Sequence, residues 1–77
     1  MMITTKAMVE VFKTDVAVPE EAQLLADALL ARFPNSKPSF DLDDCDKVLR
    51  IEGGMLCTNT IINIVNQFGY NCHILDY

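Results

Sequence analysis

Apolar and polar residues alternate along residues 7–13, which read Ala-Met-Val-Glu-Val-Phe-Lys. Alternation with a period of two, together with β-branched and aromatic residues, is typical of a strand with one buried face. We expect Val9 and Val11 to form that buried face. The opposite, open face would then carry Met8, Glu10 and Phe12.

A helical pattern follows at residues 19–33. Pro19-Glu20-Glu21 suits a first helical turn, because proline lacks a donor that this position would not use and carboxylates complement the positive end of a helix. Phe33-Pro34-Asn35-Ser36 ends the helix. The expected core-facing stripe is Ala22, Leu25, Leu29 and Phe33.

Residues 39–52 alternate again and predict a β-hairpin. Phe40 and Leu42 alternate with aspartates, and a turn is expected at Asp44-Cys45-Asp46. In the returning strand, Leu49 and Ile51 would face the core. Val48, Arg50 and Glu52 would face outward.

A second helix is predicted after Gly53-Gly54, with Thr58 or Asn59 as its cap and Gly69 as its left-handed stop. Its stripe is Cys57, Ile61, Ile64, Val65 and Phe68. Residues 71–75 predict a final strand. His73 and Leu75 would share one face of that strand, and Cys72 and Ile74 the other.

The order strand, helix, strand, strand, helix, strand predicts an α+β domain. Right-handed crossovers built from this order give a ferredoxin-like βαββαβ plait, a four-stranded antiparallel sheet of order 4-1-3-2 with two helices on one face. We expect a single domain over residues 7–77, preceded by a short N-terminal tail at residues 1–6.

Charge and composition narrow the function classes. Six Lys and Arg against eleven Asp and Glu give a net charge of −5, which argues against a nucleic-acid binder, because phosphate binding depends on clustered basic residues. The start of the chain has no apolar export segment and no stretch is long enough to cross a membrane, so we expect a cytoplasmic protein. Three cysteines without a Cys-x-x-Cys pair favour reduced thiols over a disulfide framework.

Three stretches together carry a resemblance to a known family. They are the Val9-x-Val11 strand, the hairpin from Asp41 to Ile51, and the closing run Ile61-Ile62-x-Ile64-Val65-x-x-x-Gly69-Tyr70-x-Cys72-x-Ile74-Leu75. Over most of residues 7–77 the chain resembles the heavy-metal-associated domains of small copper chaperones and metal-pumping ATPases. The resemblance implies the plait architecture described above.

The same family binds Cu(I) or Zn(II) through a Met-x-Cys-x-x-Cys loop between the first strand and the first helix. The matching segment here, residues 14–20, reads Thr-Asp-Val-Ala-Val-Pro-Glu and contains no cysteine, histidine or methionine. Tyr70, just before the last strand, is the one counterpart of a family residue beside the metal, although we interpret it as a core aromatic. The resemblance therefore implies a member of the family without its usual metal loop, and no cofactor is expected.

The remaining metal-binding candidates are Cys45, Cys72 and His73. Adjacent strand residues point to opposite faces, so Cys72 and His73 cannot both reach one ion within an ordinary strand. We expect Cys45 to be exposed in its turn, Cys57 to be a small core residue, and His73 to be packed. The acidic segment Asp41–Asp46 could offer oxygens to a hard cation, but we interpret it as a solvated hairpin that discourages edge-to-edge aggregation.

The chain lacks a phosphate-binding glycine loop, a nucleophile motif and a pair of candidate catalytic carboxylates, so we do not expect an enzyme. The leading hypothesis is a small interaction or regulatory module, as a homodimer or bound to another protein through the open sheet face or an edge strand. The expected contact residues are Met8, Phe12, Val48 and Ile74. The alternatives are a divergent Cu(I) or Zn(II) binder using Cys45, Cys72 or His73, and a plait that senses a small molecule.

Overall fold

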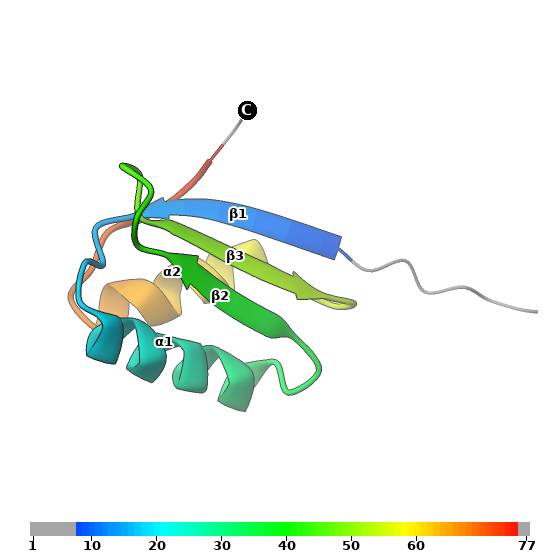
Figure 1. Ribbon diagram of the computed structural model, residues 1–77. Helices are drawn as coiled ribbons and strands as arrows, with labels where there is room; N and C mark the ends of the chain where they lie inside the picture. Colours follow the sequence, from blue (N-terminus) through cyan, green and yellow to red (C-terminus); the bar gives the residue numbers. More distant parts are fainter. Residues whose placement is uncertain (1–7, 76–77) are drawn as a thin grey trace, which may run out of the picture.

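The computed structural model of the chain describes residues 8–75, so the predicted tail at residues 1–6 lies outside the described residues. Strands and helices follow in the predicted order (Figure 1). The elements are β1 (Met8–Thr14), α1 (Pro19–Arg32), β2 (Lys37–Asp41), β3 (Val48–Gly53), α2 (Thr58–Gln67) and β4 (Cys72–Ile74). The predicted α+β class, with one antiparallel four-stranded sheet and two helices, is confirmed.

The sheet has the order β2-β3-β1-β4, and each neighbouring pair is antiparallel. β3 and β1 are therefore the central strands, and β2 and β4 form the edges. Both helices lie on the same face of this sheet, below it in Figure 1. The molecule thus has two layers, and one face of the sheet is turned away from the helices.

The core lies between the sheet and the helices. Leu25 and Leu29 of α1 and Ile61 and Val65 of α2 are fully buried, as their helical spacing predicts. Burying a side chain of this size stabilises the fold by about 1.5–3 kcal/mol. The rest of the buried apolar cluster is Phe12, Val16, Ala22, Phe33, Leu49, Ile51 and Cys72.

Helix α2 ends as predicted but begins differently. Gly69 has a φ of +93°, the left-handed conformation expected of a helix stop, and its amide donates to the Asn66 carbonyl at 2.9 Å. The N-cap is Cys57, not Thr58 or Asn59, and it makes no side-chain capping bond. Phe68, predicted in the core stripe, is exposed, because it stands at the C-cap, where the helix ends.

The face assignment predicted for β1 is wrong. Phe12 lies opposite Leu49 in the register and is 0% exposed, so it faces the helices. Val9 is 42% exposed and lies on the other face. Both faces of this strand are apolar in sequence, and the larger aromatic side chain gains more from burial than a valine does.

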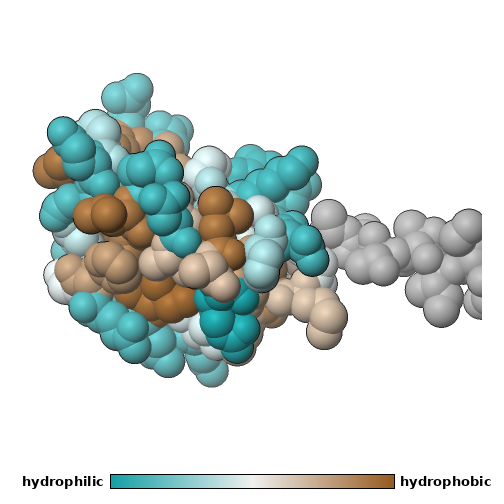
Figure 2. Space-filling view, turned by 90° about the horizontal axis from the view of Figure 1, so that it is seen from below, coloured by the Kyte–Doolittle hydropathy of each residue, from teal (hydrophilic) through white to brown (hydrophobic). Residues whose placement is uncertain are grey.

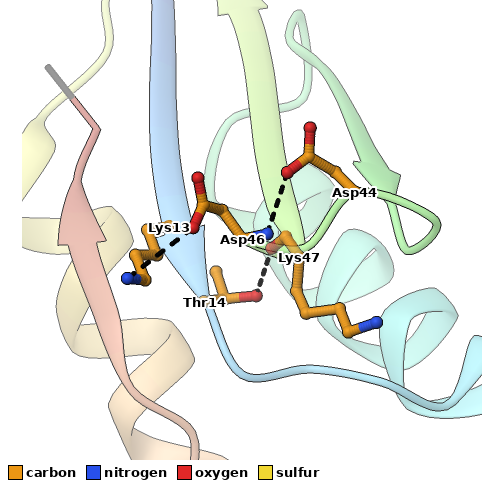
Figure 3. A network of polar contacts seen from close by, with 5 residues as sticks. All are labelled: Lys13, Thr14, Asp44, Asp46 and Lys47. Atoms are coloured by element: carbon orange, nitrogen blue, oxygen red, sulfur yellow. Dashed lines mark hydrogen bonds and ion pairs between the residues drawn. The ribbon is translucent and has the colours of Figure 1, made fainter. Parts of the chain in front are cut away.

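A polar network closes the end of the sheet where β1 stops and the hairpin turns (Figure 3). The Thr14 hydroxyl donates to the carbonyl of Lys47 at 2.6 Å and accepts from the amide of Val16 at 3.2 Å. The Thr14 amide donates to the Asp46 carbonyl at 3.1 Å. The hairpin turn therefore lies against the end of β1.

Candidate functional site

We call the face of the sheet that is turned away from the helices the outer face. It carries a cluster of valines. Residues opposite each other in a register share a face, so the pairs Val9 with Glu52, Val11 with Arg50 and Lys13 with Val48 all lie there. Val11 and Val48 are half-buried and Val9 is exposed. The centre of the outer face is therefore apolar.

The outer face is organised as three rows across the strands. The first row is Lys37, Glu52 and Val9, the second is Ser39, Arg50 and Val11, and the third is Asp41, Val48, Lys13 and His73. Charges of both signs thus surround the valines. The two charged residues of β2, Lys37 and Asp41, lie in the first and third rows, at opposite ends of that edge strand.

Only one of the four predicted contact residues lies on the outer face, namely Val48. Phe12 is in the core. Met8 lies on the same face of β1 as Phe12, four residues along the strand, and Ile74 lies there too because it pairs with Phe12. Ile74 is nevertheless exposed, since β4 is a short edge strand. The sequence-based prediction that Val9 and Val11 lie in the core is wrong. Their cross-strand partners, Glu52 and Arg50, are charged, and this is the signal that could have placed both valines on the outer face.

The structure does not bring the predicted metal candidates Cys45, Cys72 and His73 together. Cys45 is exposed in the hairpin turn, as expected. Cys72 is buried on the helix side of the sheet, where desolvation raises the pKa of its thiol to about 11. His73, predicted to be packed, is exposed, because it follows Lys13 in the register onto the outer face.

Among residues 8–75, the one cluster of three or more His, Cys, Asp or Glu side chains close enough to share an ion is Asp44, Cys45 and Asp46. Its carboxylates already have partners. Asp44 accepts a hydrogen bond from the Asp46 amide at 2.8 Å, and Asp46 lies 3.6 Å from the Lys13 ammonium (Figure 3). These contacts account for the cluster as part of the hairpin turn.

Hydrogen bonds occupy the loop that follows β1, where the resembled family has its metal site. The Tyr70 hydroxyl donates to the Glu21 carboxylate, which with desolvation and the charges of Glu21 and Asp15 raises the pKa of Tyr70 to about 12. Asp15 accepts from the amide and side chain of Asn71 at 2.8 and 3.0 Å. Polar contacts therefore join the segment before β4 both to the β1–α1 loop and to the first turn of α1.

Cys57 is exposed, contrary to the prediction that it packs in the core. It stands one residue before α2, so the helical spacing that joins it to Ile61 in sequence does not direct it inward. The polar groups of Thr60, with smaller effects from the Asn59 backbone and the positive charge of Arg32, lower the pKa of the Cys57 thiol.

The helix layer has an apolar surface of its own. Figure 2 views the protein from the helix side, where brown side chains gather between hydrophilic ones. The exposed large apolar residues of α1 and the end of α2 are Leu24, Leu30 and Phe68. Substitutions at these residues can therefore serve as controls for substitutions on the outer face.

The comparisons with protein-family models, curated proteins and solved structures find no match. The resemblance to heavy-metal-associated domains therefore stays a prediction from the sequence. Within the described part of the chain, neither helix has the length and apolar character needed to cross a bilayer.

Proposed function

We propose that this protein is a small, non-enzymatic cytoplasmic interaction module that binds a second copy of itself through the outer face. The observation that carries the proposal is the apolar centre formed by Val9, Val11 and Val48 on the face turned away from both helices. A one-sided antiparallel sheet usually presents polar side chains to water. Three valines in its centre instead favour burial against a partner.

The charge pattern favours a second copy as that partner. A two-fold axis running along the middle row, Ser39-Arg50-Val11, would place the first row of one copy against the third row of the other. Lys37 of each copy would then face the partner's Asp41, and Glu52 would lie near the partner's Lys13. Opposite charges would meet on both sides of the axis, and on the axis Val11 would meet Val11 of the second copy, with Arg50 beside its own counterpart.

The edge strands are less suited to pairing with another chain. β2 contains Pro38, which has no amide donor, and charged residues at both ends, Lys37 and Asp41. β4 is only three residues long. These features discourage strand addition at the edges, so the proposal places the contact on the outer face.

The strand order and the common side of the helices support assigning the fold to the ferredoxin-like plait, as part of the same proposal. In such a plait the outer face is left for contacts with partners. The proposed role therefore needs neither the metal loop of the resembled family nor a catalytic group.

Sedimentation velocity of the full chain over a range of concentrations tests the proposal. We expect a concentration-dependent dimer for the wild type and a shift towards monomer for the double variant V11T/V48T, which keeps β-branched side chains while reducing apolar surface. The matched control L24T removes an exposed apolar residue from the helix side and should leave the dimer intact. A wild type that stays monomeric at all concentrations, or a dimer lost in L24T and kept in V11T/V48T, would contradict the proposal.

A further inference from the structure

A cavity of about 750 Å³ opens at the end of the sheet where β1 begins and β3 ends. Three segments meet around it: the start of β1, the end of α1 with the turn that follows, and the loop from β3 to α2. Small-molecule sites usually have volumes of about 300–1,000 Å³, so this cavity has the size of a ligand site. None of its lining residues belongs to the outer face, so it is separate from the proposed dimer contact.

The innermost wall of the cavity is closely packed. Ser36 and Gly53 both line the cavity and are buried, and the Ser36 hydroxyl donates to the Phe33 carbonyl at 2.7 Å. A Cβ placed on Gly53 would lie 3.2 Å from the Ser36 Cβ and 3.1 Å from the Leu56 Cδ2. The glycine therefore allows the turn after α1 and the loop after β3 to touch, and this wall is part of the packed fold.

Most of the remaining lining is apolar. Apolar side chains come from all three segments, namely Met8, Phe33, Pro34, Met55 and Leu56. Met55 is 90% exposed and Met8 is 45% exposed, although apolar side chains of this size are usually buried. Methionine side chains adapt their shape to an apolar neighbour, so these two can pack against an apolar ligand and lose contact with water.

The charge of the lining selects the ligand further. Arg32 lines the cavity, and within the part of the chain that the structure describes no carboxylate does, although the sequence has eleven Asp and Glu. The Arg32 guanidinium lies 5.2 Å from the centroid of the Phe33 ring, which holds the positive charge beside the apolar wall. Among residues 8–75 no Asp or Glu forms an ion pair with it. A ligand carboxylate would supply that partner through paired hydrogen bonds to the guanidinium.

We propose that this cavity binds a small monocarboxylate with an apolar body. The carboxylate binds the Arg32 guanidinium, and the apolar body lies against Met8, Phe33 and Met55. One guanidinium neutralises one carboxylate, so a single negative charge suits the site. A cationic ligand would be repelled by Arg32, and a neutral one would leave the guanidinium without a partner. The site adds small-molecule binding to the proposed interaction module.

The test is an amide NMR titration of the full chain with octanoate, at concentrations well below those at which it forms micelles. We expect saturable binding of one octanoate per chain, with shifts centred on residues 32–36 and 53–57. Octanol and octylamine have the same chain length without the negative charge. They should bind roughly tenfold more weakly or worse, because neither forms the charge-assisted hydrogen bonds to Arg32.

Two arginine variants, each checked for folding by circular dichroism, locate the charge. R32Q should lose roughly tenfold in octanoate affinity and bind octanoate and octanol alike. R50Q removes the other arginine, which lies on the outer face, and should bind octanoate as the wild type does.

Unchanged octanoate binding in R32Q, or octylamine binding as tight as that of octanoate, would overturn the proposal. So would the absence of saturable binding, or shifts centred on Leu24 and Phe68, which would show general adsorption to exposed apolar residues. Because the dimer assay uses variants of the outer face, the two proposals fail independently.

Discussion

The hydroxyl of Thr14 donates a 2.6 Å hydrogen bond to the carbonyl of Lys47, 33 residues further along the chain. Lys47 has a φ of +46°, a conformation that is uncommon for a residue other than glycine. Its ammonium donates to the Leu42 carbonyl at 2.9 Å, and its amide donates to the Asp44 carbonyl at 3.0 Å. The end of β1 and the interior of the hairpin turn thus stabilise each other.

Replacing Thr14 by valine should therefore destabilise the protein. Thr14 is buried, and the variant would leave the Lys47 carbonyl and the Val16 amide without their partner. We expect a loss of about 1–3 kcal/mol in the free energy of unfolding, measured by urea denaturation. T14S keeps the hydroxyl and is the control. Equal stability of T14V and the wild type would show that this hydrogen bond has no net effect.

The hydrogen bond from Tyr70 to Glu21 predicts a specific pH dependence. The folded protein holds the tyrosine pKa at about 12, above its ordinary value of 10.0, so the unfolded chain loses this proton first as the pH rises. The stabilisation is therefore fully present below pH 10.0 and decreases as the pH rises from there through about 12. Tyrosinate absorbance, compared between the wild type and Y70F, should assign the late-titrating tyrosine to Tyr70. An ordinary titration of Tyr70 would refute the bond.

The three thiols should react at different rates in the folded protein. Alkylation follows the thiolate, so Cys57, with its lowered pKa and exposed position, should react fastest at neutral pH. Cys72 is buried and its pKa is raised to about 11, so it should react only after denaturation. Mass spectrometry of peptides after short treatment with iodoacetamide measures the order. Rapid labelling of Cys72 before Cys57 would contradict the described burial.

The helices could be predicted well because each has one apolar stripe. Steps of three and four residues, as in Ala22-Leu25-Leu29 and Ile61-Ile64-Val65, place side chains on one face in a helix but not in a strand. Leu25, Leu29, Ile61 and Val65 are all fully buried. The first and last residues of each helix are harder to predict from the sequence. Cys57 continues the stripe of α2 by spacing, but it lies before the first helical residue and is exposed.

The faces of β1 could not be predicted for a physical reason. Val9 and Val11 on one side and Met8 and Phe12 on the other are all apolar, so alternation identifies a strand without choosing its buried side. The choice depends on how the Phe12 ring fits between the sheet and the helices, which local sequence does not determine. Because of this ambiguity, Phe12 was predicted in the contact surface, whereas Val9 and Val11, which lie on the outer face, were not.

The most direct test of the central claim is a dilution series followed by amide NMR shifts of the full chain. Self-association through the outer face predicts concentration-dependent shifts at Val9, Val11 and Val48, with little change at Leu24 and Leu30 of α1. Shifts confined to the helix side, or spectra that do not change with concentration, would contradict the claim that the outer face binds a second copy.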